Sequence, residues 1–376
     1  MSEFTGNIGE WSEVYVFFRI LGEHFITACD EKLQSGNQPS FPVAEIRRDE
    51  SGTTPLTFRF NKSSDEWTIY QGGNYRSQIS AAESHSEAIS LLQELLSTIR
   101  SKKSGTAKTE TGKGLSFPKA EKFLRRLHAT AIKAKSKSKQ DIELTIRDTR
   151  AGGDVSCGFS IKSFLSNPPT LLNASAKTVF VYEVEGIQES DIEDINSSKI
   201  GLFIHKIQQA NGHIKWHSMD EQYRRNLMFI DTAMPQIISE VLLTHFSSCH
   251  LKNSEKLRSV HRATRETAKK DPISVSDENL YVYKIQKLLE ATALGMIPSE
   301  PWNGIEDANG GFIIVKPEGE IVTFHIYNRN AFMKYLYNNT YFEHPDSGRY
   351  NIGKIYKENG RYFFGLPLNI RYEKIS

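Results

Sequence analysis

Alternation of apolar and polar residues predicts a β-hairpin near the middle of the chain. The alternation runs over Asp141–Arg147 and again over Gly158–Ser163, and the sequence DTRAGGD between the two runs is rich in turn-forming residues. A period of two is typical of strands, and Gly next to Asp favours a turn. The pattern therefore predicts a hairpin that buries Ile142, Leu144 and Ile146 on one face.

Helical and strand-like patterns alternate along the rest of the chain. Apolar residues at helical spacing predict helices, and short apolar runs between turn signals predict strands. The predicted helices cover Glu10–Gly22, Ser86–Arg100, Pro118–Ala134, Asp231–His245, Ser254–Lys270, Asp277–Leu294 and Arg329–Tyr337. The predicted strands cover Phe41–Arg48, Leu56–Phe60, Glu66–Tyr70 and Thr178–Val184, and predicted hairpins pair Ile200–Gln209 with His213–Ser218, Gly311–Lys316 with Glu320–Ile326, and Lys354–Lys357 with Arg361–Phe364. This order predicts a mixed α/β protein with a β-rich carboxyl-terminal region.

The composition is that of a globular protein, because 38% of the 376 residues are hydrophobic. No apolar run approaches the ~20 residues that span a bilayer, and no charged-then-apolar leader opens the chain. Cys29, Cys157 and Cys249 are widely separated and form no CxxC pair that would suggest a zinc finger. We therefore expect a cytoplasmic protein with no membrane partner.

Positive charge is concentrated in one part of the chain, although the net charge of the whole is only +2. Residues 100–139 contain 13 Lys or Arg against two glutamates, a local net charge of +11. Such a run is often a solvated face, but this one directly precedes the predicted hairpin. Lys135, Lys137 and Lys139 are therefore predicted to bind the phosphate backbone of a nucleic acid.

One face of the predicted hairpin combines acids with a lysine. Strand alternation places Asp141 and Glu143 on the polar face, and correct pairing brings Ser160 and Lys162 beside them. Carboxylate oxygens bind Mg²⁺, and an ammonium group can neutralise charge that develops on a phosphate. The pattern suits metal-assisted phosphodiester hydrolysis, while an ordinary charged strand face is the alternative interpretation.

Three stretches of the sequence together carry a family resemblance: SKSKQDIELTIRDTRAGGDVSCGFSIKSFLSNPPTLLNASAKTVFVYEV, the opening GNIGEWSEVYVFFRILGE and the ending YFFGLPLNIRYEKI. They resemble the HpaII family of type II restriction endonucleases. The resemblance implies a PD-(D/E)xK nuclease core, with a mixed central sheet flanked by helices, that hydrolyses double-stranded DNA with Mg²⁺ at a short palindrome, CCGG being a candidate. It also implies a homodimer and a companion DNA methyltransferase.

The resemblance assigns roles to several residues and leaves one ligand unaccounted for. It implies that Asp141 binds metal and that Lys162 stabilises charge or orients the attacking water. Gln140 replaces the family's usual proline, and Ser160 stands where the common pattern has an acid. The missing acid has two candidates, because Glu10 in GEWSE matches the family's first-helix acid and strand alternation favours Glu143.

Other residues are candidates for contacts with DNA. Asn173 could read a base edge or cap a helix, and Arg349 lies on a polar loop of the kind that carries direct readout. Arg371 lies in the family-like carboxyl end and could instead have a structural role.

The chain is predicted to contain four consecutive regions. Residues 1–100 form an amino-terminal α+β region with the first core helix, and residues 101–118 form a basic linker. Residues 119–270 form the nuclease core, and residues 271–376 form a carboxyl-terminal α+β region for DNA recognition. Two alternative functions remain at this point: a nuclease of the same fold that acts on damaged or branched DNA, and a DNA-binding protein whose catalytic core has degenerated.

Overall fold

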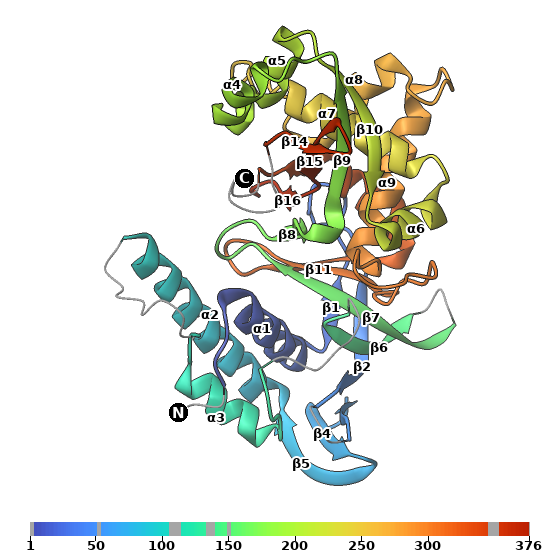
Figure 1. Cartoon of the computed structure of the whole chain (residues 1–376). Helices are drawn as coiled ribbons and strands as arrows, with labels where there is room; N and C mark the ends of the chain where they lie inside the picture. The colour runs from blue at the N-terminus through green and yellow to red at the C-terminus, as the bar shows by residue number, and fades with distance from the viewer. Residues whose placement is uncertain are drawn as a thin grey trace. The chain divides into compact units, whose positions relative to one another are not determined.

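A computed structural model describes residues 4–50, 54–104, 114–132, 140–148, 152–344 and 353–375 (Figure 1). The chain divides into two compact units. The first contains Met1–Pro169, Glu306–Phe332 and Lys374–Ser376, and the second contains Thr170–Ile305 and Met333–Glu373. The predicted lysines 135, 137 and 139, and Arg349, lie outside the described residues. The four functional regions expected from the sequence remain a prediction.

The first unit is built on a nine-stranded mixed sheet. The strand order is β12-β11-β7-β6-β2-β3-β4-β5, and β1 pairs with β2 beside this path. The β7–β11 pair is parallel, and the other described pairs in this sheet are antiparallel. The strands are β1 (Phe25–Thr27), β2 (Ser40–Arg48), β3 (Leu56–Asn61), β4 (Glu66–Gln71), β5 (Asn74–Ser80), β6 (Ile142–Asp148), β7 (Gly153–Ser163), β11 (Gly311–Val315) and β12 (Ile321–His325). The predicted mixed α/β fold is thus confirmed.

Helix α1 (Ile8–Glu23) is the central helix of this unit. Residues all round it are buried, including Trp11 and Phe18, because it packs against both the sheet and helix α2 (Ala81–Lys103). Helix α3 (Pro118–Arg126) adds Phe123, whose ring lies 4.8 Å from that of Phe18. Figure 1 shows the three helices gathered beside the sheet. Because this packing fixes the helix, the polar side chains of α1 project from defined points beside the sheet.

The predicted hairpin is confirmed as β6 and β7. Ile142 pairs with Phe159 and Asp148 with Gly153, so strand pairing extends further than expected. β7 begins five residues before the predicted strand, since its first half pairs along the whole of β6. The buried side chains of β6 face the core that α1 completes.

The second unit combines two smaller sheets with helices. One sheet has the order β10-β9-β15-β14, and the other has the order β13-β16-β8. Their strands are β8 (Thr170–Leu172), β9 (Val179–Glu185), β10 (His213–Met219), β13 (Thr340–Phe342), β14 (Tyr356–Glu358), β15 (Arg361–Pro367) and β16 (Ile370–Tyr372). The helices are α4 (Asp191–Ser197), α5 (Ile200–Gln209), α6 (Glu221–Ile230), α7 (Met234–Ser247), α8 (Val260–Lys270) and α9 (Glu278–Leu294). Helix α10 (Arg329–Asn338) crosses the division at Phe332, and short 3₁₀ turns cover Ala176–Thr178 and Ile326–Asn328.

One predicted strand was wrong. Ile200–Gln209 is helix α5, and β10 pairs with β9 in place of the expected hairpin. The buried residues of α5 are Phe203, Ile204 and Ile207, which share one face of a helix at three- and four-residue spacing. A short apolar run is ambiguous between helix and strand, and here packing against α7 decides it.

Within the described ranges, no single helix is long and apolar enough to cross a membrane. Helices α6 and α7 pass the length and composition test only as a pair, and the chain bends by 105° between them.

Candidate active site

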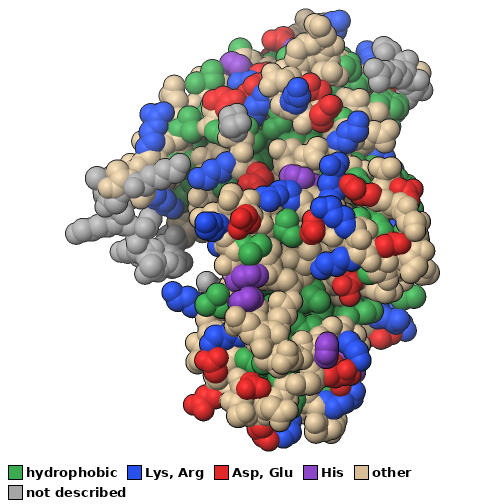
Figure 2. Space-filling model, turned by 90° about the horizontal axis from the view of Figure 1, so that it is seen from above, with side chains coloured by type: hydrophobic (Ala, Val, Ile, Leu, Met, Phe, Trp, Pro, Cys, Tyr) green, Lys and Arg blue, Asp and Glu red, His purple; other side chains and the backbone are tan. Residues whose placement is uncertain are grey.

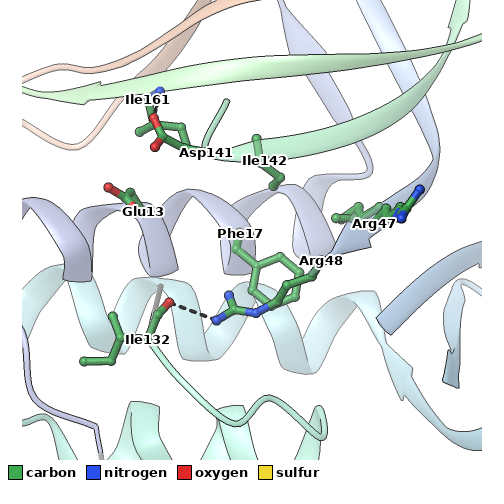
Figure 3. Close-up of a pocket in the computed structure, with 9 residues that line it drawn as sticks. Glu13, Phe17, Arg47, Arg48, Ile132, Asp141, Ile142 and Ile161 are labelled. Atoms are coloured by element: carbon green, nitrogen blue, oxygen red, sulfur yellow. Dashed lines mark hydrogen bonds between the residues drawn. The ribbon is translucent and has the colours of Figure 1, made fainter. Parts of the chain in front are cut away.

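A small hollow in the first unit lies between α1, β2, β6 and β7 (Figure 3). Asp141, just before β6, and Glu13, on α1, direct their carboxylates into the same space. The residues that line the hollow are Glu13, Phe17, Ile46, Arg47, Arg48, Ile132, Asp141, Ile142 and Ile161. The fold thus brings two acids together from segments that are more than a hundred residues apart.

Asp141 is held by the neighbouring strand. Its backbone N–H donates to the carbonyl of Phe159 at 2.8 Å. Its Oδ2 accepts the backbone N–H of Ile161 at 2.7 Å and the hydroxyl of Ser160 at 3.2 Å. These bonds fix the carboxylate and leave Oδ1 without a hydrogen bond among the described residues. The predicted closeness of Asp141 and Ser160 is therefore present in the structure.

Ser160 is almost completely buried, with 1% of its surface exposed. Its hydroxyl donates to Asp141 and so orients that carboxylate. A neutral hydroxyl is a poor ligand for a hard cation compared with a carboxylate. Ser160 is therefore itself unsuited to bind such a cation.

Glu10 and Glu13 lie one turn apart on α1 and have different surroundings. The Oε2 atom of Glu10 accepts the backbone N–H of Asn7 at 2.8 Å, and the Asn7 side chain accepts the N–H of Glu10 at 3.0 Å. This reciprocal pair is a capping box that begins the helix. Glu13, in contrast, lines the hollow beside Asp141. The geometry favours Glu13 as the first-helix acid of the site.

Glu143 lies further along β6, opposite Gly158. Its carboxylate is 3.9 Å from the guanidinium of Arg47 and accepts the Ser156 hydroxyl at 3.4 Å. Arg47 also lies 3.5 Å from Asp49, and about half of its side chain is exposed. Glu143 therefore belongs to a charged group around Arg47, and it is not among the residues that line the hollow.

Arg48 is a structural residue of the hollow. Its guanidinium donates to Glu50 at 2.7 Å and to the carbonyl of Ile132 at 2.9 Å, the bond drawn in Figure 3. Both Arg48 and Glu50 are buried, so each needs the other to offset the loss of hydration. Of the two arginines that line the hollow, Arg48 is thus buried and Arg47 is exposed.

Lys162 lies on β7 opposite Ile314 of β11. Strand alternation places it on the same face as Ser160, and its ammonium is 6.0 Å from the centre of the Phe312 ring. Within the described part of the chain it forms no ion pair with Asp141. The structure thus brings Asp141 together with Ser160 and Glu13, while Lys162 is held beside an aromatic ring.

The nearby cysteine is unsuited to act as a nucleophile. Burial above all, together with the nearby carboxylates of Glu143 and Asp148, raises the pKa of the Cys157 thiol to about 12. The reactive groups that line the hollow are thus the carboxylates of Asp141 and Glu13, and carboxylate oxygens suit a hard divalent cation.

Residues 7–372 match the family described as HpaII restriction endonuclease. The chain belongs to this family. A curated relative, the type II restriction enzyme HpaII of Haemophilus parainfluenzae, is 34% identical over 375 residues, which cover 98% of this chain and 99% of the relative. No solved structure gives a significant match. As a member of the HpaII family, the chain is a type II restriction endonuclease, a site-specific enzyme whose substrate is DNA.

Two DNA-contact candidates of this HpaII-family chain lie in described parts of the second unit. Asn173 is exposed just after β8, and the 3₁₀ turn that follows is capped by Ser175, so Asn173 does not cap it. Arg371 on β16 donates from Nε to Glu343 at 2.9 Å, which links two neighbouring strands. The geometry therefore leaves Asn173 available for a ligand and gives Arg371 a structural contact.

Glu13 and Arg47 are the site residues that the sequence analysis did not select. Glu13 is three residues from Glu10, the spacing of one helical turn, and this was the available signal. Figure 2 shows basic and acidic side chains of the described residues interspersed over the visible face. Arg47 becomes a candidate only because folding places it at the hollow.

Proposed function

We propose that the hollow at Asp141 and Glu13 is the catalytic centre and that it works with Mg²⁺. The observation that carries this proposal is the convergence of the two carboxylates, one from the β6–β7 hairpin and one from α1. Two carboxylates with few other oxygen donors suit Mg²⁺, which usually keeps several waters and binds through one or two acids. In a PD-(D/E)xK core where Ser160 replaces an acid, Glu13 would supply the second carboxylate beside Asp141.

Each residue of the hollow has a distinct part in the proposed reaction. Asp141 and Glu13 would hold the metal ion, which when bound supplies positive charge to the phosphate and makes water more acidic. Ser160 and the Ile161 N–H keep the Asp141 carboxylate in one orientation. Arg47, exposed at the hollow, binds a DNA phosphate next to the one that is cut.

Lys162 has a separate proposed role. In the free protein its ammonium lies beside the Phe312 ring, outside the lining of the hollow, and it would stabilise negative charge on the phosphate once DNA is bound. The contact with the Phe312 ring holds the side chain in the free protein, and a cation–π contact of this length is weak enough to be exchanged for a phosphate.

The proposed substrate is a short palindrome in double-stranded DNA, with CCGG as the candidate sequence. A two-fold sequence is read most simply by a two-fold dimer, so we expect a homodimer on DNA. A methyltransferase that protects the same sequence would accompany the enzyme, and both would act in the cytoplasm.

Digestion of a plasmid of known sequence tests this function. With Mg²⁺, the expected result is a set of discrete fragments that map to one short sequence, and with a chelator no cleavage is expected. A smear would indicate a nuclease without a fixed sequence, and no cleavage in either condition would indicate a DNA-binding protein with a degenerate core.

A further inference from the structure

A second group of metal-ligating side chains lies in the second unit, away in sequence from Asp141 and Glu13. His245, Cys249 and His344 each offer one ligand atom, and the three atoms lie within 4.8 Å of one another. None of them takes part in the proposed cleavage reaction. Nitrogen and sulfur donors of this kind are not ligands for Mg²⁺ but suit Zn²⁺.

The local fold explains why these residues meet. His245 lies in the last turn of α7, and the chain continues in turns that place Cys249 four residues on, with its thiol 3.4 Å from the His245 carbonyl. His344 follows β13, and the N–H of Phe342 donates to the carbonyl of Arg258 at 2.9 Å. This bond ties the end of β13 to the segment that follows α7.

His245 carries the strongest sign of a missing ligand. Its side chain is 1% exposed, and its Nδ1 lies 2.9 Å from the carbonyl of Leu257. Because a carbonyl only accepts, Nδ1 carries the proton and Nε2 keeps a lone pair. Among the residues that the structure describes, that buried Nε2 has no hydrogen-bond partner. A buried imidazole whose other nitrogen is held by a carbonyl is the usual arrangement of a metal-bound histidine.

The ligand atoms of Cys249 and His344 are separated by nearly the distance that two ligands of one zinc ion would have. The thiol of Cys249 lies 3.2 Å from Nε2 of His344. Tetrahedral zinc with bonds of about 2.0–2.3 Å holds its ligands roughly 3.3–3.8 Å apart, so small side-chain rotations would complete the set. Aromatic rings enclose it, since those of Phe246 and His344 lie 5.0 Å apart and those of His245 and Phe342 also 5.0 Å apart.

We propose that His245, Cys249 and His344 form a Zn²⁺ site that joins the end of α7 to the end of β13. On binding, the thiol loses its proton to solvent and the sulfur and two imidazole nitrogens coordinate the ion, with water in the fourth position. The thiolate offsets part of the charge that the ion adds beside Lys256 and Arg258, which lie close enough to act on the cluster. The ion would stabilise the second unit by linking segments that are 95 residues apart.

Cobalt binding tests the site directly, because a thiolate bound to Co²⁺ gives a near-ultraviolet absorption band. The full chain carrying Asp141→Asn is used, so that the proposed cleavage site contributes little metal binding. It is stripped with a chelator and titrated with Co²⁺, then with Zn²⁺. We expect about one Co²⁺ per chain, a sulfur-dependent band, displacement by Zn²⁺ and a rise in melting temperature on loading.

Three variants in the same background make the test specific. Cys249→Ala should abolish the band, and His344→Gln should weaken Co²⁺ binding at least about tenfold. Cys157→Ala removes a buried thiol of the first unit and should bind as the parent does. Circular dichroism checks that each variant is folded, and His344→Gln, which changes a partly buried side chain, keeps the test valid if Cys249→Ala misfolds. The proposal is overturned if the parent shows no band, or if a folded Cys249→Ala or His344→Gln variant binds Co²⁺ as tightly as the parent.

Discussion

At the scale of single residues, the hydrogen bond from Ser160 to Asp141 gives this buried serine a role in orienting the carboxylate. The hydroxyl cannot replace a charged ligand, but it keeps the carboxylate aimed into the hollow. Hydrogen bonds to charged groups contribute about 1.5–3 kcal/mol, so losing this one matters to a geometry-sensitive reaction.

Ser160→Ala should lower the cleavage rate at saturating Mg²⁺ about tenfold or more, because the Asp141 carboxylate keeps only the Ile161 N–H as a fixed partner. Single-turnover cleavage of a short duplex measures this rate. Ser163→Ala is the matched control on the same strand and should cut nearly as the parent does, since within the described ranges the Ser163 hydroxyl oxygen accepts only the Leu165 N–H. Equal cleavage rates for the two variants would show that Ser160 does not contribute to the reaction.

Lys162→Ala should abolish strand cleavage and leave specific DNA binding largely intact, because the lysine acts on charge that develops during the reaction. Gel-shift binding without Mg²⁺ and cleavage with Mg²⁺ separate the two effects. Removing the side chain also removes the contact with Phe312, so the melting temperature of the variant is compared with that of the parent. A stable variant that still cuts at the parental rate would show that Lys162 is a structural residue.

At the scale of elements, the sheet extends beyond the hairpin because β11 pairs in parallel with β7 and leads directly into β12. Gly311, the first residue of β11, has φ +125°, a conformation that side chains strongly disfavour. A Cβ atom there would lie 1.9 Å from the carbonyl oxygen of Phe324 on β12. The close approach of the two strands therefore requires glycine at this position.

Gly311→Ala should destabilise the protein by about 2–4 kcal/mol, because it combines backbone strain with a clash against main chain that cannot rotate away. Urea unfolding followed by fluorescence measures the change. Gly153→Ala at the start of β7 is the control, since a Cβ there meets nothing within 4 Å, and it should shift stability by less than about 0.5 kcal/mol. A small effect at Gly311 would mean that β11 and β12 are less closely paired than described.

The elements show where sequence patterns are sufficient and where they are not. The β6–β7 hairpin and the closeness of Asp141 to Ser160 were predictable because pairing across a short turn is local. The choice between Glu10 and Glu13 was not, since both lie on α1 and only its packing against β6 and β7 decides which acid faces the hollow. Helix α5 was mistaken for a strand for the same reason, because its buried face is defined by α7.

At the scale of the whole molecule, a net charge of +2 means that affinity for DNA depends on where the basic residues gather. The densest cluster, residues 100–139, precedes Asp141 in sequence, and part of it lies outside the described residues. The cluster of His245, Cys249 and His344, in contrast, could not be recognised in the sequence, because a spacing of 95 residues between two ligands matches no zinc motif. The basic run is therefore visible in the sequence, whereas long-range folding creates the histidine–cysteine cluster.

Replacing Lys135, Lys137 and Lys139 together by Gln should weaken binding to all DNA sequences alike. Each phosphate contact adds about 0.9 to the slope of log affinity against log salt, so three lost contacts should flatten the slope by up to about 2.7. Fluorescence anisotropy over a range of KCl concentrations, with a cognate and a scrambled duplex, measures both slopes. An unchanged slope would show that these lysines do not contact phosphate.

The central claim, that Asp141 and Glu13 together bind the catalytic Mg²⁺, is tested most directly by comparing Glu13→Gln with Glu10→Gln across a Mg²⁺ titration of cleavage. The two acids lie one turn apart on α1, but only Glu13 lines the hollow, while Glu10 caps the helix. We predict that Glu13→Gln raises the Mg²⁺ concentration for half-maximal cleavage at least about tenfold, as expected for a lost carboxylate ligand. Glu10→Gln should leave that concentration unchanged and cost about 0.5–1 kcal/mol of stability. Parental cleavage by Glu13→Gln at low Mg²⁺, or a raised Mg²⁺ requirement in Glu10→Gln alone, would contradict the account.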